Sequence, residues 1–387
     1  MKVLIVSNSN LYSGGANQYE KLVSNLFKIN NDKYKFFYLS SENNNKNNII
    51  YYKKNIIDKV LNILNRNIFI YKIFQRIFKT TSRFEKILNK NKINIIYFLS
   101  PNTLAFELSN IPFITTVWDL EHRNFNYFPE LNYNNEIEKR DITYNKILQK
   151  SFKIIVESEI TKKNIVEYYL VNKNKISVLP FFIDENDFND LSYQSKYVNL
   201  NNTNYILYPA QFWSHKNHIY LIEVMKLFKN HNSKLKLILT GTDKGNLFFI
   251  KKQINLYGLE NTIKILGFVD RKDLIYLYKN CLALVMPTLI GPTNIPPLEA
   301  FASNTLVCHS DLEFARAQLK DAAIYFDINK PSTLFEILND IINNSLKYEK
   351  YKLNGKKIIK NWKGSDFYNK MILIFDEYEF FRKTWSK

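Results

Sequence analysis

The sequence predicts an α/β protein built from two doubly wound domains, each with its own parallel sheet. Short runs of β-branched and aromatic residues alternate with longer helix-like stretches along almost all of the 387 residues. Strands that are covered by helices on both faces read as such near-continuous apolar runs. Twelve candidate strands exceed one comfortable sheet, so two sheets of about six strands each are the simpler arrangement.

The candidate strands fall into two sets, one in each half of the chain. In the first half they are residues 3–7, 35–39, 94–99, 113–117, 153–157 and 176–182. In the second half they are residues 205–209, 236–240, 262–267, 283–287, 305–309 and 323–326. Segment 184–204 is rich in Asn, Asp and Ser and is the expected linker. We therefore expect an N-terminal domain over 1–190, a C-terminal domain over 200–360 and a final helix within 361–387.

Composition narrows the class of protein. Lys and Arg number 54 against 36 acidic residues, a formal charge of +18, which favours an anionic partner. The two cysteines exclude a disulfide scaffold and suit a cytoplasmic protein. Residues 1–7 read as a buried strand rather than a signal peptide, and no apolar run reaches the length of about 18 residues that spans a membrane. Nucleic acid is disfavoured as the anionic partner, because no recognisable nucleic-acid-binding motif occurs.

Segment 46–92 concentrates this positive charge. It holds 12 Lys and Arg residues, against Asp58 and Glu85 alone, and apolar residues recur between them. That pattern predicts a basic amphipathic helical segment, as found at the surface of anionic membranes. The alternative is an ordinary helix packed on a sheet with its basic face in solvent. Peripheral contact with a membrane is therefore one of two open interpretations.

A glycine pair, Gly14 and Gly15, separates the first strand from the helix that follows. Glycine lets the backbone approach a ligand, and the start of a helix directs N–H groups at an anion. The sequence around the pair is neither Gly-x-Gly-x-x-Gly nor a Walker motif, which disfavours hydride transfer and P-loop hydrolysis. Any tight turn from strand to helix could use the same pair.

The second half of the chain has a corresponding turn between a strand and a helix, and this turn carries Lys216. It follows a strand and precedes a helix whose apolar stripe includes Leu221 and Val224. A cation near a helix N-terminus has no favourable dipole partner unless an anion is bound, so we expect a phosphate there. The alternative is an exposed lysine. His215 and His218 have spacing that could hold a metal, but no further Cys/His cluster supports one, so we expect solvent or capping roles for them.

The loop after strand 283–287 predicts a second anion site. It leads into a helix whose first turn contains prolines, and the N–H groups of that turn would face a phosphate. Glu299, one turn into this helix, can accept two hydrogen bonds from a ribose diol or simply complement the helix dipole. Phe268 and Val269 end another strand, where backbone groups could read the edge of a base. These loops all lie beyond the carboxyl ends of the strands, where open α/β sheets bind ligands.

In the first half, Asp119 and His122 follow strand 113–117. Both side chains are expected to face a cleft and to handle the hydroxyl group of an acceptor. For Asp119 the alternative is a cap for the helix that follows.

With these motifs assembled, the chain resembles the retaining GT-B-fold glycosyltransferases of family 4 over most of its length. The resemblance rests on Gly267–Val269, on Pro296–Ala300, on Asp321–Asp327 and on His215–Asn217. It implies two Rossmann-like domains that face a central cleft, with a C-terminal helix that crosses back onto the N-terminal domain. It also implies a nucleotide-sugar donor, with Lys216 on the diphosphate and no other cofactor.

The residues expected to bind the donor, taken together, are Gly14, Gly15, Gln211, Lys216, Gly241, Phe268, Val269, Thr293, Asn294, Ile295 and Glu299. Three positions depart from the family pattern. Gln211 stands where the family often has an arginine, Gly291 stands where it has a second glutamate, and Trp118 stands where many members have a histidine.

The function predicted is transfer of a hexose-type sugar from a GDP-, UDP- or dTDP-linked donor to a glycan or a lipid-linked glycan, with retention at the anomeric carbon. Bacterial surface polysaccharide synthesis, of O-antigen or capsule, would be the setting. The chain contains no Asp-x-Asp, so Lys216 rather than a metal is expected to stabilise the departing diphosphate, with Asp119 or His122 orienting the acceptor. Two alternatives remain: a sugar-nucleotide epimerase of the same fold, and a non-catalytic protein that binds glycan or nucleotide.

Overall fold

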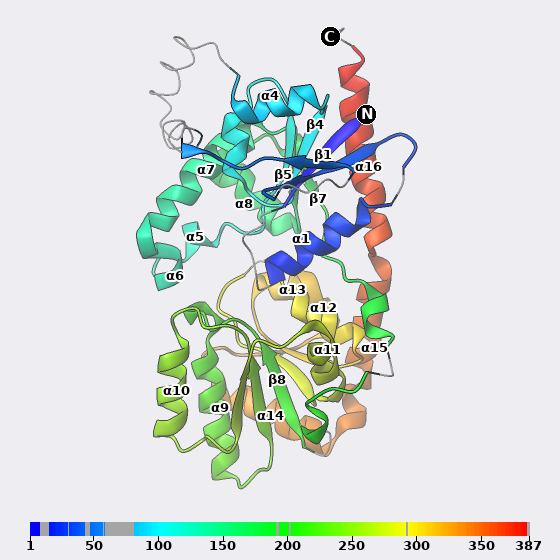
Figure 1. Ribbon diagram of the computed structural model, residues 1–387. Helices are drawn as coiled ribbons and strands as arrows, with labels where there is room; N and C mark the ends of the chain where they lie inside the picture. The colour runs from blue at the N-terminus through cyan, green and yellow to red at the C-terminus, as the bar shows by residue number, and fades with distance from the viewer. Residues whose placement is uncertain are drawn as a thin grey trace. The chain divides into compact units, whose positions relative to one another are not determined.

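The computed structural model describes residues 1–7, 15–29, 31–42, 47–56, 58, 81–190, 193–200, 203–291 and 293–384. The chain forms two compact units. Unit 1 comprises Met1–Asn124, Asn132–Pro180 and Gly364–Lys387, and unit 2 comprises Phe125–Leu131 and Phe181–Lys363. Each unit has a parallel sheet with helices around it (Figure 1), which confirms the predicted class of two Rossmann-like α/β domains.

The sheet of unit 1 has the strand order β3-β2-β1-β4-β5-β6-β7, and its neighbouring strands are parallel. The strands are β1 Lys2–Val6, β2 Lys35–Ser40, β3 Ile49–Tyr51, β4 Ile95–Phe98, β5 Phe113–Thr116, β6 Lys153–Val156 and β7 Ile176–Val178. Six of them match predicted strands. The exception is β3, a short edge strand that pairs with β2 inside the segment expected to be a basic helix.

That expectation for segment 46–92 is therefore wrong at Ile49–Tyr51 and confirmed as helix only at Arg83–Lys90. At the beginning of this segment, pairing with β2 outweighs the helical pattern, because three residues are enough to extend the edge of a sheet. Residues 46, 57 and 59–80 lie outside the described residues. Arg83 forms an ion pair with Asp58, 2.8 Å from Nη2 to Oδ2, so part of the basic charge is neutralised within unit 1.

The helices of unit 1 are α1 Gly15–Leu26, α4 Arg83–Lys90, α5 Glu121–Asn124, α7 Glu136–Lys150, α8 Glu159–Tyr169 and α16 Gly364–Arg382. The last of these, α16, packs against α1 within unit 1 (Figure 1). Phe375 of α16 lies 6.1 Å from Phe27 and 5.7 Å from Tyr34, measured between ring centroids. Met371, Phe375 and Tyr378 on the same helix are buried, whereas Phe381 is 44% exposed.

The sheet of unit 2 has the order β10-β9-β8-β11-β12-β13 and is also parallel. Its strands are β8 Tyr205–Pro209, β9 Lys236–Thr240, β10 Ile263–Gly267, β11 Ala283–Met286, β12 Leu306–Ser310 and β13 Ile324–Phe326. All six match predicted strands. The chain runs outward from β8 to β10 and then returns to β11 beside β8, so the order of the strands reverses between β8 and β11. A doubly wound sheet binds ligands at such a switch point, beyond the carboxyl ends of its strands.

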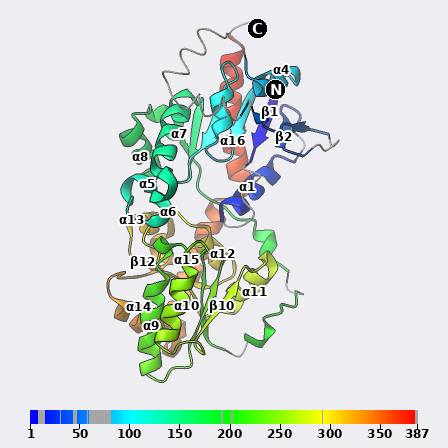
Figure 2. The same ribbon diagram turned by 60° about the vertical axis from the view of Figure 1, so that its left-hand side comes forward.

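Helices cover both faces of this second sheet. They are α9 His218–Asn230, α10 Leu247–Leu256, α11 Arg271–Asn280, α12 Ile295–Ala302, α13 Glu313–Leu319, α14 Pro331–Asn343 and α15 Glu349–Asn361. Most of the short helix α6 Pro129–Asn132 also belongs to unit 2. Helix α9 packs beside α10 and α14 on one face, and α12 packs beside α11 and α15 on the other (Figures 1 and 2). Right-handed crossover connections place the helices on one face where the chain runs from β8 out to β10, and on the other face where it runs from β11 out to β13.

The segment expected to be a linker, 184–204, is anchored on unit 2 where it is described. Tyr193 and Ser195 donate hydrogen bonds to Asp273 of α11, and Asp187 pairs with Arg271. Lys279 of the same helix donates to the carbonyl of Phe188. Polar residues in this segment therefore bind one helix rather than leaving the backbone in solvent.

Candidate functional site

The switch point of unit 2 brings two loops together. After β8 the chain forms a short 3₁₀ turn, Ser214–Lys216, and after β11 it forms the loop that leads into α12. The backbone N–H of Leu289 in that second loop donates to the carbonyl oxygen of His215, at 2.9 Å. The turn that carries Lys216 is therefore joined directly to the loop that precedes Glu299.

Lys216 is held at this junction with its charge directed at the sheet. The Tyr208 hydroxyl donates to the Lys216 carbonyl, at 2.9 Å. Burial lowers the pKa of His309, at the end of β12, to about 4, and the positive charge of Lys216 acts in the same direction. His218 shows the same two causes, with a pKa lowered to about 3. The positive charge of Lys216 thus acts on a residue at the carboxyl end of β12, the edge of the sheet at which the sequence predicts an anion.

The two histidines that flank Lys216 have roles that the sequence does not predict. His218 is fully buried and lies between Tyr208 and Phe212, with ring centroids 5.0 and 4.9 Å away. His215 receives a carboxylate from Glu130 of α6, which accepts from both its backbone N–H and its ring. The expected solvent and capping roles are therefore wrong. His218 is part of the core, and His215 is anchored by a residue 85 positions earlier in the chain.

The start of α12 differs in detail from the predicted cradle of N–H groups. Pro296 and Pro297 occupy the first turn and have no N–H, and the N–H of Asn294 donates to Gln318 of α13, at 2.9 Å. The backbone of Ile295 therefore keeps the one other amide in this turn. Among the described residues, the buried Thr293 Oγ1 and Asn294 Nδ2 atoms have no hydrogen-bond partner. Buried polar atoms are nearly always paired, so these two atoms mark a place where a ligand or water completes the structure.

Glu299 lies at the centre of a buried charge network. Its side chain is 3% exposed, accepts from the Tyr278 hydroxyl at 2.9 Å and pairs with the Arg271 guanidinium. Arg271 also pairs with Asp187, at 3.2 Å. The sequence singles out Glu299 but neither Arg271 nor Tyr278, which lie 28 and 21 positions away. The one available signal is that Arg271 directly follows the Phe268–Asp270 strand end.

The other predicted donor-site residues take varied positions. Gln211 is held by Trp213 and Thr242, with its amide bonded to both side chains. Gly241 has φ of +147°, and any side chain there would collide with the Ala210 carbonyl, so a structural requirement for glycine exists at this strand end. Phe268 is 64% exposed, whereas its neighbour Val269 is buried.

In unit 1, Gly15 begins α1, and Gly14 lies outside the described residues. Asp119 follows β5 and accepts from the Glu121 N–H at 3.2 Å, so it caps the short helix α5. Its carboxylate also pairs with Arg140, at 3.4 Å, and its side chain is 34% exposed. The capping role is therefore present, and one side of the carboxylate still reaches solvent.

His122 is not placed as the sequence predicts. It is fully buried, and its Nε2 lies 3.0 Å from Asp141 and 3.3 Å from the Tyr169 hydroxyl. Arg123 binds the same aspartate through two nitrogens. Burial lowers the pKa of His122. The ring is therefore buried rather than facing a cleft as expected, with Nε2 bound to Asp141 and Tyr169, and Nδ1 has no hydrogen-bond partner among the described residues.

Two absences concern only the part of the chain that the structure describes. No three His, Cys, Asp or Glu side chains there group in a way that could hold a metal ion. No helix there is both long enough and apolar enough to cross a membrane.

Two family models match the chain, one in each unit. Residues 192–358 match Glycosyl transferases group 1, and residues 36–187 match Glycosyltransferase Family 4. Among curated proteins, the chain is 28% identical to the O-antigen chain mannosyltransferase RfbU of Salmonella typhimurium, over 54% of this chain and 58% of the relative. It is 27% identical to the uncharacterized glycosyltransferase MJ1607 of Methanocaldococcus jannaschii, over 52% and 56%. The chain thus aligns with little more than half the length of these curated relatives.

Solved structures share the fold over nearly the whole chain. Sucrose-phosphate synthase from Thermosynechococcus elongatus superposes with a TM-score of 0.76 at 15% identity, covering 98% of this chain and 99% of its own. HepE from Anabaena, solved in complex with UDP-glucose, gives a TM-score of 0.72 at 14% identity, covering 97% and 100%. These likenesses show the fold, and the matches of both units show the family. The chain belongs to the GT-B glycosyltransferases of family 4, the glycosyl transferases group 1.

Proposed function

We propose that this protein transfers a hexose-type sugar from a nucleoside-diphosphate donor to a hydroxyl group of a glycan or lipid-linked glycan, with retention at the anomeric carbon. The observation that carries the proposal is the junction at the switch point of unit 2. The hydrogen bond from Leu289 to His215 ties the Lys216 turn to the loop before α12. One edge of the sheet thereby gathers a cation, two unsatisfied polar side chains and a buried carboxylate.

Each of these groups suits one part of the donor. As the bond from sugar to phosphate breaks, negative charge grows on the departing diphosphate, and Lys216 stabilises it from a partly buried position. Thr293 Oγ1 and Asn294 Nδ2 offer hydrogen bonds to phosphate oxygens at the start of α12. Glu299 would accept from the ribose, because its buried carboxylate, held by Arg271 and Tyr278, is the kind of group that accepts hydrogen bonds from a diol.

The departing group needs no metal in this proposal, because Lys216 and the side chains around α12 supply the stabilisation. Removal of one such donor from an enzyme site typically costs a factor of roughly 10² to 10³ in turnover. We therefore expect Lys216→Ala to lower kcat by about 10²-fold or more and EDTA to leave turnover unchanged. Lys251→Ala, at an exposed position on α10, is the matched control and should retain full turnover. Near-normal turnover of Lys216→Ala would remove Lys216 from the mechanism.

The identity of the donor is open to a direct test. A ligand that binds only the folded state stabilises it by about 2.7 kcal/mol at a hundred times its Kd. Thermal unfolding should therefore be followed with UDP-, GDP-, dTDP- and ADP-sugars, and the cognate donor should raise the melting temperature the most. A donor that binds without transfer to any acceptor would favour the alternative of a non-catalytic protein. Analysis of the product's anomeric configuration tests retention.

On the acceptor side, we propose Asp119 as the residue that meets the acceptor hydroxyl. It is the predicted group of unit 1 with a carboxylate still partly exposed at the carboxyl edge of the sheet. The relative named as an O-antigen chain mannosyltransferase supports polysaccharide synthesis as the setting. We further propose a lipid-linked glycan as the acceptor and, from the charge of segment 46–92, contact with an anionic membrane from the cytoplasmic side. Co-sedimentation with vesicles that contain 30% phosphatidylserine, against vesicles of phosphatidylcholine alone, tests the membrane part of this proposal.

A further inference from the structure

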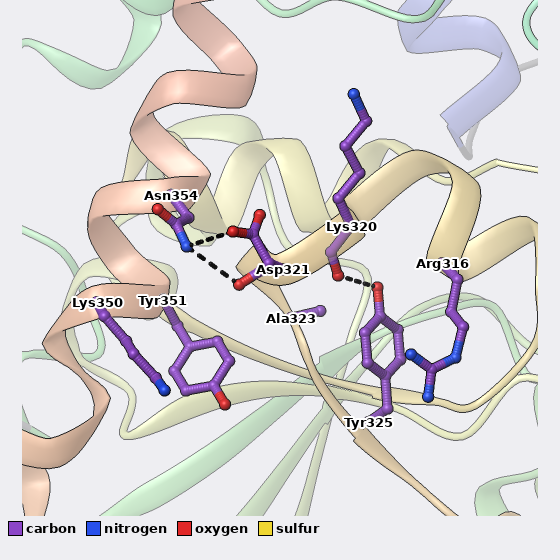
Figure 3. Close-up of a pocket in the computed structure, with 8 residues that line it drawn as sticks. All are labelled: Arg316, Lys320, Asp321, Ala323, Tyr325, Lys350, Tyr351 and Asn354. Atoms are coloured by element: carbon purple, nitrogen blue, oxygen red, sulfur yellow. Dashed lines mark hydrogen bonds between the residues drawn. The ribbon is translucent and has the colours of Figure 1, made fainter.

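A separate cavity lies at the edge of unit 2, on the side of β13. It has a volume of about 470 Å³ and is lined by residues from α13, from the turn Lys320–Ala322, from β13 and from α15 (Figure 3). Pockets of roughly 300–1,000 Å³ accommodate small-molecule ligands. None of the residues assigned to the donor lines this cavity. It is therefore a second candidate site on the same unit.

The positive charges around this cavity do not converge on its centre. The Arg316 guanidinium binds Asp311 through two nitrogens and lies over the Tyr325 ring, 4.4 Å from its centroid. The Lys350 ammonium lies 5.1 Å from the centroid of the Tyr351 ring. Figure 3 shows the Lys320 side chain extending away from the other labelled residues. A phosphate group needs several donors directed at one point, and this arrangement does not provide them.

What the cavity does present is a pair of aromatic rings with hydrogen-bonding groups between them. Tyr325 comes from β13 and Tyr351 from α15, and in Figure 3 their rings lie on opposite sides of Asp321 and Ala323. Asn354 donates to Asp321 Oδ2 at 2.9 Å, which leaves further acceptor positions on that carboxylate. A pyranose ring has apolar C–H faces that pack on aromatic rings and hydroxyls at its rim that donate and accept. Aromatic walls, a carboxylate and an amide match both properties.

We propose that this cavity binds a pyranose unit of a neutral glycan chain, at a place distinct from the donor site. The walls of the cavity also support the donor helix. Gln318 of α13 holds the backbone of Asn294 through two hydrogen bonds, at 2.9 and 2.7 Å, while Arg316 two positions earlier lines the cavity. Gly355 of α15 packs directly on Phe301 of α12. A glycan in this cavity is thus held by the helices that position α12.

The test is isothermal titration of the full chain with maltotriose, mannotriose and N,N′-diacetylchitobiose, with and without saturating UDP. We expect at least one of these neutral sugars to bind, with the same Kd in both conditions. Tyr351→Ala should weaken that binding at least tenfold, whereas Tyr351→Trp, which keeps an aromatic face, should stay within about threefold. Tyr133→Ala, which removes a tyrosine that is 73% exposed on unit 1, is the matched control and should leave the Kd unchanged.

Several outcomes would overturn the proposal. The first is no binding of any neutral sugar by the wild-type chain. The second is binding that Tyr351→Ala leaves intact while thermal unfolding shows that this variant is folded. The third is binding of the anionic sugar trigalacturonate, titrated in the same way, without binding of any neutral sugar, which would indicate an anion site. Competition by UDP would place the sugar in the donor site instead. Failure of UDP to bind at all would count against the proposed function and leave this test unaffected.

Discussion

Replacement of Arg271 by alanine tests the buried charge network around Glu299. The carboxylate is 3% exposed and would lose the guanidinium with which it forms an ion pair. Removing one member of a buried ion pair costs about 3–5 kcal/mol, because the other charge stays buried and uncompensated. The hydroxyl of Tyr278 remains on the carboxylate, and the departing guanidinium is 28% exposed, so water can partly replace it. We therefore expect the lower end of this range, about 3 kcal/mol.

The loss should be visible in the unfolding of unit 2. For a domain of about 150–250 residues, 1 kcal/mol shifts the melting temperature by roughly 2–4 °C, so we expect a decrease of about 6–12 °C. Thermal and urea unfolding should be followed for Arg271→Ala, Glu299→Gln and the double variant. The double variant has no uncompensated charge and should be more stable than Arg271→Ala alone. Arg271→Lys keeps the charge but not the second contact to Asp187, and it should lie between the wild type and Arg271→Ala.

Two results would refute this reasoning. If Arg271→Ala unfolds within about 0.5 kcal/mol of the wild type, the ion pair makes no net contribution, as for many exposed pairs. If the effects of the two single replacements add up in the double variant, Arg271 and Glu299 are not coupled. In either case the proposed role of Glu299 in binding a ribose would lose the support of this network.

Two further predictions concern packing and pH. Gly355→Ala places a methyl group against the buried ring of Phe301, and we expect a loss of about 1–3 kcal/mol, measured by urea unfolding against Lys356→Ala, at the exposed neighbouring position of α15. Burial lowers the pKa of His218 and His309 to about 3 and 4, so the unfolded chain binds more protons and stability should fall below pH 6.5, by up to about 1.4 kcal/mol per pH unit for each histidine. Unfolding of His218→Phe between pH 6.5 and 5 should show a smaller slope than the wild type, and an equal slope would contradict the assignment.

Most of the fold was predictable from the sequence for one physical reason. Strands covered on both faces must be apolar along their whole length, and strands inside each sheet, such as β4 and β11, are buried at every position. The strand that the sequence does not predict, β3, is three residues long and lies at the edge of the sheet, where a strand needs a neighbour on one side only. Its residues carry no periodic signal of their own, and the basic pattern that follows them suggests a helix.

The candidate site was predictable only in its backbone positions. Lys216, Asn294 and Glu299 each follow a strand, and the carboxyl ends of parallel strands meet at one edge, so their proximity follows from topology. Their partners come from elsewhere in the chain. Glu130 reaches His215 across 85 positions, and Arg271 reaches Glu299 across 28, distances that no local pattern encodes.

The prediction for His122 failed for a related reason. A histidine just after a strand has two directions available, into a cleft or into the core, and the sequence near it does not decide between them. The choice is made by Asp141 and Tyr169, which lie 19 and 47 positions later and enclose the ring. An aspartate partner of this kind stabilises one orientation of an imidazole, and here it holds the imidazole in the core.

Two features of unit 2 have a common consequence. Gln211 stands where the family often has an arginine, so the proposed donor site lacks that cation, and two prolines leave the first turn of α12 with fewer N–H groups. Side-chain atoms of Thr293 and Asn294, buried without a partner among the described residues, lie at the point where those amides are missing. A side chain loses rotamer freedom when it binds a ligand, whereas a backbone amide is already held in place by the helix. A single substitution can also remove a side-chain donor. The affinity of this protein for a diphosphate should therefore depend more on individual residues at positions 216, 293 and 294 than a cradle of helix N–H groups would.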